Sequence, residues 1–312
     1  MTRCKIKVKS RLNVTGILLL FGILATGALL PGIMAELVSE GLSLAVKHVI
    51  PTAFPFMIIS EYYIFYGAPQ KLRNIGAVLG KIFGFGEGGI GAYIVGNICG
   101  FPQGARIISE EYTLGNLDKE EREVLLAYCE NPSLAFVVGA VGIGMLGSCK
   151  SGIILFLSVH LSSALCGLIF RVKRVNSRNT VQTSRQKPIF VEVVMSSGRT
   201  CIDIISIIVA FSVICGLTKK LLGDGLLFGI AVSISEVTSA LSYFTSSSPL
   251  EPVIRFFFIG FSLGFGGICV LLQTAIFTSR VGISLMPYLK IKLCQGLICG
   301  AVVALLERIC VF

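Results

Sequence analysis

Long apolar runs separated by short polar stretches make up most of this 312-residue chain. Several runs approach or exceed the roughly 18 to 20 residues that an α-helix needs to cross a bilayer. They lack the regular alternation of a membrane β-strand. The pattern therefore predicts an all-α fold, namely a polytopic helical membrane protein with about eight apolar segments.

Three of the apolar segments contain residues that do not suit a continuous helix. The stretch 96–106 contains Pro102, residues 130–134 contain an Asn-Pro pair, and residues 260–267 are rich in glycine. A helix that breaks at membrane depth leaves backbone N–H and C=O groups that lipid cannot satisfy. These interruptions therefore indicate places where protein, water or a ligand lines a site.

Glycine or alanine recurs at every fourth position from residue 80 to residue 104. Part of this pattern is typical of a face on which transmembrane helices pack closely. Because an α-helix has 3.6 residues per turn, positions four apart drift by about 40° per step. One straight helix cannot present all of them on one face, so the pattern favours short helices that meet at glycine-rich turns.

Composition and charge agree with a membrane protein. The chain is 54% hydrophobic and 14% charged, whereas soluble domains are about one-quarter charged. Its net charge of +10 lies mainly beside the apolar runs, where the positive-inside rule expects it. No basic stripe alternates with aromatic residues, so the expected partner is the lipid bilayer and not nucleic acid.

The basic stretches also predict a topology. The N-terminal residues 1–11 and the stretches 71–81 and 171–187 are all expected in the cytoplasm. Three apolar segments lie between 71–81 and 171–187. If all three crossed the membrane, the two stretches would lie on opposite sides. One segment should therefore be re-entrant, and the best candidate is 80–104. The first apolar run, 14–30, is interpreted as an uncleaved helix, with a signal peptide as the alternative.

Four parts of the chain follow from this reading. They are a basic segment with the first transmembrane helix (1–40), a first half (41–170), a basic cytoplasmic linker (171–197) and a second half (198–312). Gly-Phe-Pro-Gln-Gly in the first half and Gly-Phe-Gly-Gly in the second each follow a helix pair. This is the pattern expected of internal repeats whose interrupted helices meet near the midplane of the membrane.

A few polar residues in apolar surroundings are candidates for a site. Glu236 should face a cavity or a partner because an ionised carboxylate is costly at membrane depth, unless its span is short and places it at an interface. Arg106 either extends to the headgroups or pairs with an anionic substrate. Asn131 and Gln273 offer amide groups. The eleven cysteines and two histidines form no metal-binding or catalytic pattern, so neither a metal nor an enzyme is expected.

An ordered set of motifs then points to a family. The motifs are Gly-Phe-Pro-x-Gly-Ala-Arg-x-x-Ser (100–109), Leu-Leu-Ala-Tyr-Cys-Glu-Asn-Pro (125–132), Gly-Ala-Val-Gly (139–142) and Glu-Val-Thr (236–238). Together they resemble the YlbJ-like sporulation integral membrane proteins, which belong with the nucleoside-recognition ("Gate") domain membrane proteins. The resemblance runs from about residue 40 to residue 306 and makes the two halves Gate-like.

The resemblance implies a role in spore formation, with passage of dipicolinic acid from the mother cell across the outer forespore membrane. Carried over residue by residue, it implies the following site: Gly100, Pro102, Gly104, Arg106, Asn131, Pro132, Glu236 and Thr238. This chain departs from the usual family pattern at three positions. Phe101 replaces a tyrosine, Arg106 replaces a lysine and Glu130 replaces a neutral residue.

The resulting hypothesis is a transporter for a small anionic ring compound. Arg106, aided by Lys150, would attract the anion, and Asn131, Thr238 and Gln273 would hydrogen-bond it. The apolar walls of the site would come from three aromatic residues, namely Phe101, Phe136 and Phe265. Glu236 would carry a coupling proton or bind Na⁺, and no other cofactor is expected.

Three alternatives remain from the sequence. The first is a nucleoside permease, which is also a transporter. The second is a non-transporting scaffold or signalling protein needed for assembly of the spore envelope. The third is an intramembrane enzyme, which fits poorly because no nucleophile–base set is present. The sequence leaves the oligomeric state, including a homo-oligomer, undecided.

Overall fold

The computed structural model describes residues 29–66, 85, 87–170, 188–246 and 248–309. These residues are almost entirely helical and contain no strand. Before the basic linker, the helices are α2 (Pro31–Leu44), the π-helical η1 (Ala45–Val49), α3 (Ile50–Tyr66), α5 (Glu87–Cys99), α6 (Gln103–Thr113), α7 (Lys119–Cys129), the π-helical η2 (Ala135–Met145) and α8 (Cys149–Ile169).

After the linker come α9 (Phe190–Leu222), α10 (Leu226–Ser235), α11 (Val237–Ser246), α12 (Pro252–Phe265), α13 (Gly267–Thr278), the 3₁₀-helical η3 (Ser279–Val281) and α14 (Leu285–Arg308). Helix α9 thus begins inside the 171–197 stretch that was expected to be linker. Residues 14–28 of the predicted first helix, the 71–81 stretch and the 171–187 linker core lie outside the described residues.

Long apolar helices confirm the predicted fold class. Among the described residues, five helical segments are long and apolar enough to cross a membrane: Pro31–Tyr66, Cys149–Ile169, Phe190–Leu222, Pro252–Val281 and Leu285–Arg308. Helix α8 also exposes Ile153, Leu157 and Leu161 at every fourth position, which places an apolar stripe on the outside of the fold. The protein is a polytopic helical membrane protein.

Four interruptions divide the shorter helices. They lie between α5 and α6, between α7 and η2, between α10 and α11, and between α12 and α13. The first, second and fourth confirm the breaks predicted within 96–106, 130–134 and 260–267. The third was not predicted from the sequence: α10 ends at Ser235 and α11 begins at Val237, with Glu236 between them.

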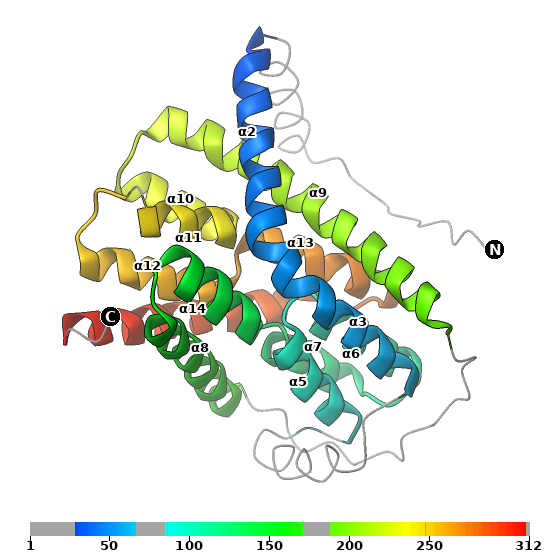
Figure 1. Ribbon diagram of the computed structural model, residues 1–312. Coiled ribbons are helices and arrows are strands. Elements are labelled where there is room, and N and C mark those ends of the chain that lie inside the picture. Colours follow the sequence, from blue (N-terminus) through cyan, green and yellow to red (C-terminus); the bar gives the residue numbers. More distant parts are fainter. Residues whose placement is uncertain (1–28, 67–84, 86, 171–187, 247, 310–312) are drawn as a thin grey trace.

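The elements around these interruptions occur in the same order twice. Helices α5 and α6 pack against each other as a hairpin, and α10 and α11 do the same. Each hairpin is followed by an interrupted helix and then by a long helix, α8 or α14. The second arm of each hairpin packs on the other interrupted helix, α6 on α13 and α11 on η2. Figure 1 shows α9 running beside the blue α2–α3 helix, against which it packs.

From Gly96 to Gly104, the glycine stripe is divided between two helices, as predicted. A Cβ at Gly96 in α5 would lie 2.9 Å from the Cys129 carbonyl oxygen, and one at Gly104 in α6 would lie 2.5 Å from the same atom. Both arms of the hairpin therefore approach the end of α7 more closely than any larger residue permits. Gly100 lies between the arms with a φ of 78°, which favours glycine because a side chain there is strained.

Candidate functional site

A small buried cavity lies where the interruptions meet. Its lining includes Gly100 and Phe101 from the first hairpin, Pro132 and Ser133 from the α7–η2 interruption, and residues 236–238 from the second hairpin. Helix α13, which follows the fourth interruption, contributes Val270 and Gln273. Segments η1, α3 and α9 close the remaining sides. The cavity volume is about 30 Å³, which is room for about one or two water molecules.

The cavity brings together part of the predicted site. The predicted residues that line it are Gly100, Phe101, Pro132, Glu236, Thr238 and Gln273, together with the predicted wall residue Phe136. The predicted residues that are not in its lining are Pro102, Gly104, Arg106 and Asn131. Phe265 is buried elsewhere in the core, and Lys150 is exposed near the start of α8.

Glu236 joins the two arms of the second hairpin. Its backbone is extended, with a φ of −150° and a ψ of 123°, so it ends α10. Its carboxylate accepts hydrogen bonds from the backbone N–H groups of Thr238 (2.8 Å) and Ser239 (2.5 Å). These are free donors at the first turn of α11, and the positive end of the helix dipole favours a negative charge there. The buried carboxylate therefore caps α11 at the edge of the cavity.

At each hairpin tip, one glycine permits close contact with the interrupted helix that follows the hairpin. A Cβ at Gly100 would lie 2.7 Å from the backbone nitrogen of Ser133. A Cβ at Gly267, whose φ is 82°, would lie 3.0 Å from the carbonyl oxygen of Ser235. A Cβ at Gly100 would be closer than real Cβ atoms come to other atoms, and the positive φ of Gly267 strains any side chain there, so both positions favour glycine.

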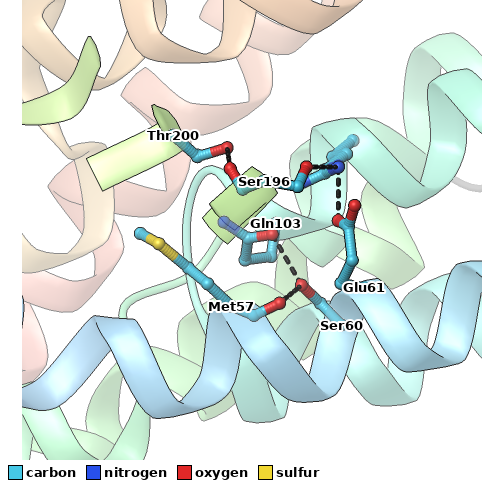
Figure 2. A network of polar contacts seen from close by, with 7 residues as sticks. Met57, Ser60, Glu61, Gln103, Ser196 and Thr200 are labelled. Atoms are coloured by element: carbon cyan, nitrogen blue, oxygen red, sulfur yellow. Dashed lines mark hydrogen bonds and ion pairs between the residues drawn. The ribbon is translucent and has the colours of Figure 1, made fainter. Parts of the chain in front are cut away.

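Arg106 belongs to a polar network that is not part of the cavity lining. It forms an ion pair with Glu61 of α3 and donates a hydrogen bond to the Ser196 hydroxyl of α9 at 3.2 Å. Nearby, the Ser60 hydroxyl donates to the side-chain oxygen of Gln103 at 2.6 Å. Figure 2 shows these contacts tying α3, α6 and α9 together. Glu61 thus neutralises the cation that the sequence analysis expected to attract an anion.

A second buried cluster, not foreseen from the sequence, surrounds Lys292 of α14. The Lys292 ammonium donates to the Glu130 backbone oxygen (2.9 Å), to Asn131 Oδ1 (3.1 Å) and to Gln295 Oε1 (2.8 Å). Gln295 Nε2 also donates to Asn131 Oδ1 at 2.8 Å. Lys292 is only 1% exposed. The available signal was a lysine inside an apolar span with a glutamine three residues later, on the same helical face.

The Glu130 carboxylate is fully buried and points to other helices. It accepts a hydrogen bond from the Ala105 backbone N–H at 2.5 Å and one from the Thr274 hydroxyl at 3.2 Å. It therefore caps the first turn of α6, as Glu236 caps α11. Glu130 is not among the residues that line the cavity, so this departure from the family pattern adds no carboxylate there.

Comparison with known proteins gives one informative match. The chain is similar to the sporulation integral membrane protein YlbJ of Bacillus subtilis (strain 168). The identity is 25% over an alignment of 332 residues, gaps included, which covers 88% of this chain and 77% of that protein. No family model matches the chain, and no solved structure matches it either. Similarity over most of both chains supports the relationship that the ordered motifs indicated. The chain is therefore a relative of the YlbJ-like sporulation integral membrane proteins.

Proposed function

We propose that the protein is a sporulation membrane transporter that moves a small anionic ring compound, dipicolinic acid, from the mother cell toward the forespore. The proposed location is the outer forespore membrane, with the N-terminus and residues 171–187 in the cytoplasm. The observation that carries the proposal is the meeting of two hairpin tips and two interrupted helices around one buried cavity. Such breaks at membrane depth are typical of substrate sites in transporters.

The lining of the cavity supports a planar solute with polar edges. Phe101 and Phe136 face each other edge to face, with ring centroids 6.5 Å apart, and aromatic faces of this kind pack against planar rings. Thr238 of α11 and Gln273 of α13 supply polar groups to the lining. In this proposal, the two aromatic residues hold the ring and the two polar residues orient it.

Transport of such a solute requires the cavity to open. A volume of about 30 Å³ accommodates water but not an aromatic ring. The hairpin tip at Phe101 and the interruption at Pro132 would have to separate to admit the solute. This requirement agrees with alternating access, in which hairpins or helix bundles move about a fixed site.

The test is uptake into proteoliposomes that contain the purified full chain and labelled dipicolinate. Thr238→Val and Gln273→Leu should each lower the initial rate by about tenfold, because each removes a hydrogen-bonding group from a buried site. Thr245→Val is the matched control, since Thr245 lies on α11 with Thr238 and its hydroxyl donates to the backbone oxygens of Leu241 and Ser242. Uptake by wild type that the two site variants leave unchanged would contradict the assignment.

One observation favours a second solute class. The carboxylate of Glu236 lies in the cavity lining, where it would repel a dicarboxylate and tolerate a neutral ring compound. The same proteoliposomes should therefore be tested with a panel of nucleosides. Uptake of a nucleoside without uptake of dipicolinate would reassign the protein as a nucleoside permease. Uptake of neither would favour a non-transporting role in envelope assembly.

A further inference from the structure

We propose that the ammonium group of Lys292 is a built-in cation, which occupies a monovalent-cation site formed where α7 is interrupted. The site consists of the Glu130 backbone oxygen, Asn131 Oδ1 and Gln295 Oε1. The inference concerns a site outside the solute cavity. Only its consequence for flux, that solute movement needs no Na⁺ at this position, rests on the proposed function.

The geometry identifies the group as a bound cation. A lysine ammonium has three N–H donors and no acceptor, and here three oxygens lie between 2.8 and 3.1 Å from the nitrogen. All three groups around the nitrogen are acceptors, so each can take one of its N–H donors. The charged form therefore uses its full hydrogen-bonding capacity at this position.

The oxygens are of the kind that bind small monovalent cations. Glu130 is the residue at which α7 ends, and carbonyl groups at a helix C-terminus lie at the negative end of the helix dipole. In membrane transporters, such unwound carbonyls and half-helix ends coordinate Na⁺. Two side-chain amide oxygens complete the set here. Asn131, Lys292 and Gln295 are all at most 1% exposed, so water does not replace any of these contacts.

The location shows what a tethered ammonium does at this position. Pro132 and Ser133, on one side of the interruption, line the cavity, whereas Glu130 and Asn131 face α14. The same Glu130 caps α6 and contacts α13 through Thr274. A cation at this position therefore joins the interrupted helix to α14, while the Glu130 carboxylate joins the same interruption to α6 and α13. A tethered ammonium does so without binding or releasing an ion.

The test removes the tethered cation and asks whether a free one replaces it. Thermal unfolding in detergent would be compared in sodium chloride and in choline chloride of equal concentration, for wild type, Lys292→Ala and Lys292→Met. Alanine leaves a vacancy among the three oxygens, whereas methionine fills the space without a charge. Lys290→Ala is the matched control, since Lys290 is on the same helix and exposed.

We expect the midpoint of Lys292→Ala to be higher in sodium than in choline by about 3 °C, because a ligand that binds only the folded state stabilises it. Wild type, Lys292→Met and Lys290→Ala should show no such difference. Equal midpoints for Lys292→Ala in the two salts would overturn the proposal.

A second variant keeps the test decisive if Lys292→Ala folds poorly. Lys292→Ser adds a hydroxyl oxygen to the vacated site and should show the same preference for sodium. Failure of both variants to fold in sodium chloride would also contradict the proposal, because Na⁺ should fill the vacated site and stabilise the folded protein. These measurements need no solute, so they stand even if proteoliposomes show no flux. Where flux is found, uptake that is faster under a Na⁺ gradient than under choline, and that stays so in Glu236→Gln, would refute the consequence for transport.

Discussion

At the scale of single residues, every buried charge described above has a partner on another helix or at a helix end. Arg106 pairs with Glu61 across α6 and α3, Lys292 binds oxygens from the α7–η2 interruption, and Glu236 caps α11. Charges without partners would be expensive at membrane depth. The pairing of buried charges therefore helps to determine which helices lie beside the cavity. Single substitutions of the paired residues can test this.

The Glu61–Arg106 pair gives a prediction at this scale. Arg106→Gln should lower stability by about 3 kcal/mol, because it leaves the Glu61 carboxylate buried without its partner. The double variant Glu61→Gln/Arg106→Gln should recover part of that loss, since two neutral amides can share a hydrogen bond. The measurement is thermal unfolding in detergent for the wild type, both single variants and the double variant.

The coupling between the two residues is the informative quantity in this cycle. A stability loss in the double variant that equals the sum of the two single losses would show that the residues act independently. It would leave Arg106 available for an anionic solute, as the sequence analysis proposed. Solute uptake measured on the same four proteins would then show whether Arg106 affects flux beyond its effect on stability.

At the scale of elements, glycine contacts hold the first hairpin against α7. The expected effect of Gly104→Ala is a loss of about 2 kcal/mol, because its Cβ would lie 2.5 Å from the Cys129 carbonyl oxygen and the helices would have to separate. Gly198→Ala in α9 is the control, since nothing lies within 4 Å of a Cβ there. Alanine at that position should be neutral or slightly stabilising. Thermal midpoints in detergent compare the two, and equal effects would contradict the close packing.

Interruptions caused by local chemistry could be predicted from the sequence. Pro102 and Pro132 lack an N–H and clash with a preceding turn, and glycine at 266 adopts a φ of 83°, so three of the four breaks left a signal in their own residues. The break at Glu236 left none, because Ser-Glu-Val contains neither glycine nor proline. It depends on the carboxylate that caps α11 and on the close approach of Gly267 from another element.

Partners far apart along the chain explain what the sequence did not reveal. A lysine near the start of an apolar span usually extends toward the headgroups, and nothing near Lys292 indicates that Asn131, 161 positions earlier, accepts its hydrogen bond. The same is true of Glu61 and Arg106. Sequence periodicity reports which residues avoid water, but the pairing of polar residues depends on how the helices are arranged.

At the scale of the whole molecule, the two hairpins and the two interrupted helices meet at a small buried cavity, so the proposed transport would require these elements to move relative to one another. Cys99, at the end of α5, lines the cavity and is 2% exposed, and Cys149 at the start of α8 is exposed. The Cys99 thiol therefore reports on the cavity, and the Cys149 thiol reports on the outer surface of the protein. The buried thiol should react only when the cavity opens.

Variants that keep either Cys99 or Cys149 as their only cysteine make this prediction measurable in proteoliposomes. Cys99 should react with a small water-soluble thiosulfonate at least about tenfold more slowly than Cys149, because it reacts only in the open minority of molecules. A saturating transported solute should change the Cys99 rate, since it occupies the cavity or shifts the fraction of open molecules, and should leave Cys149 unaffected. A Cys99 rate that matches that of Cys149 would mean that the cavity is not enclosed. A Cys99 rate that ignores a solute whose uptake is measurable would mean that the solute crosses by another route.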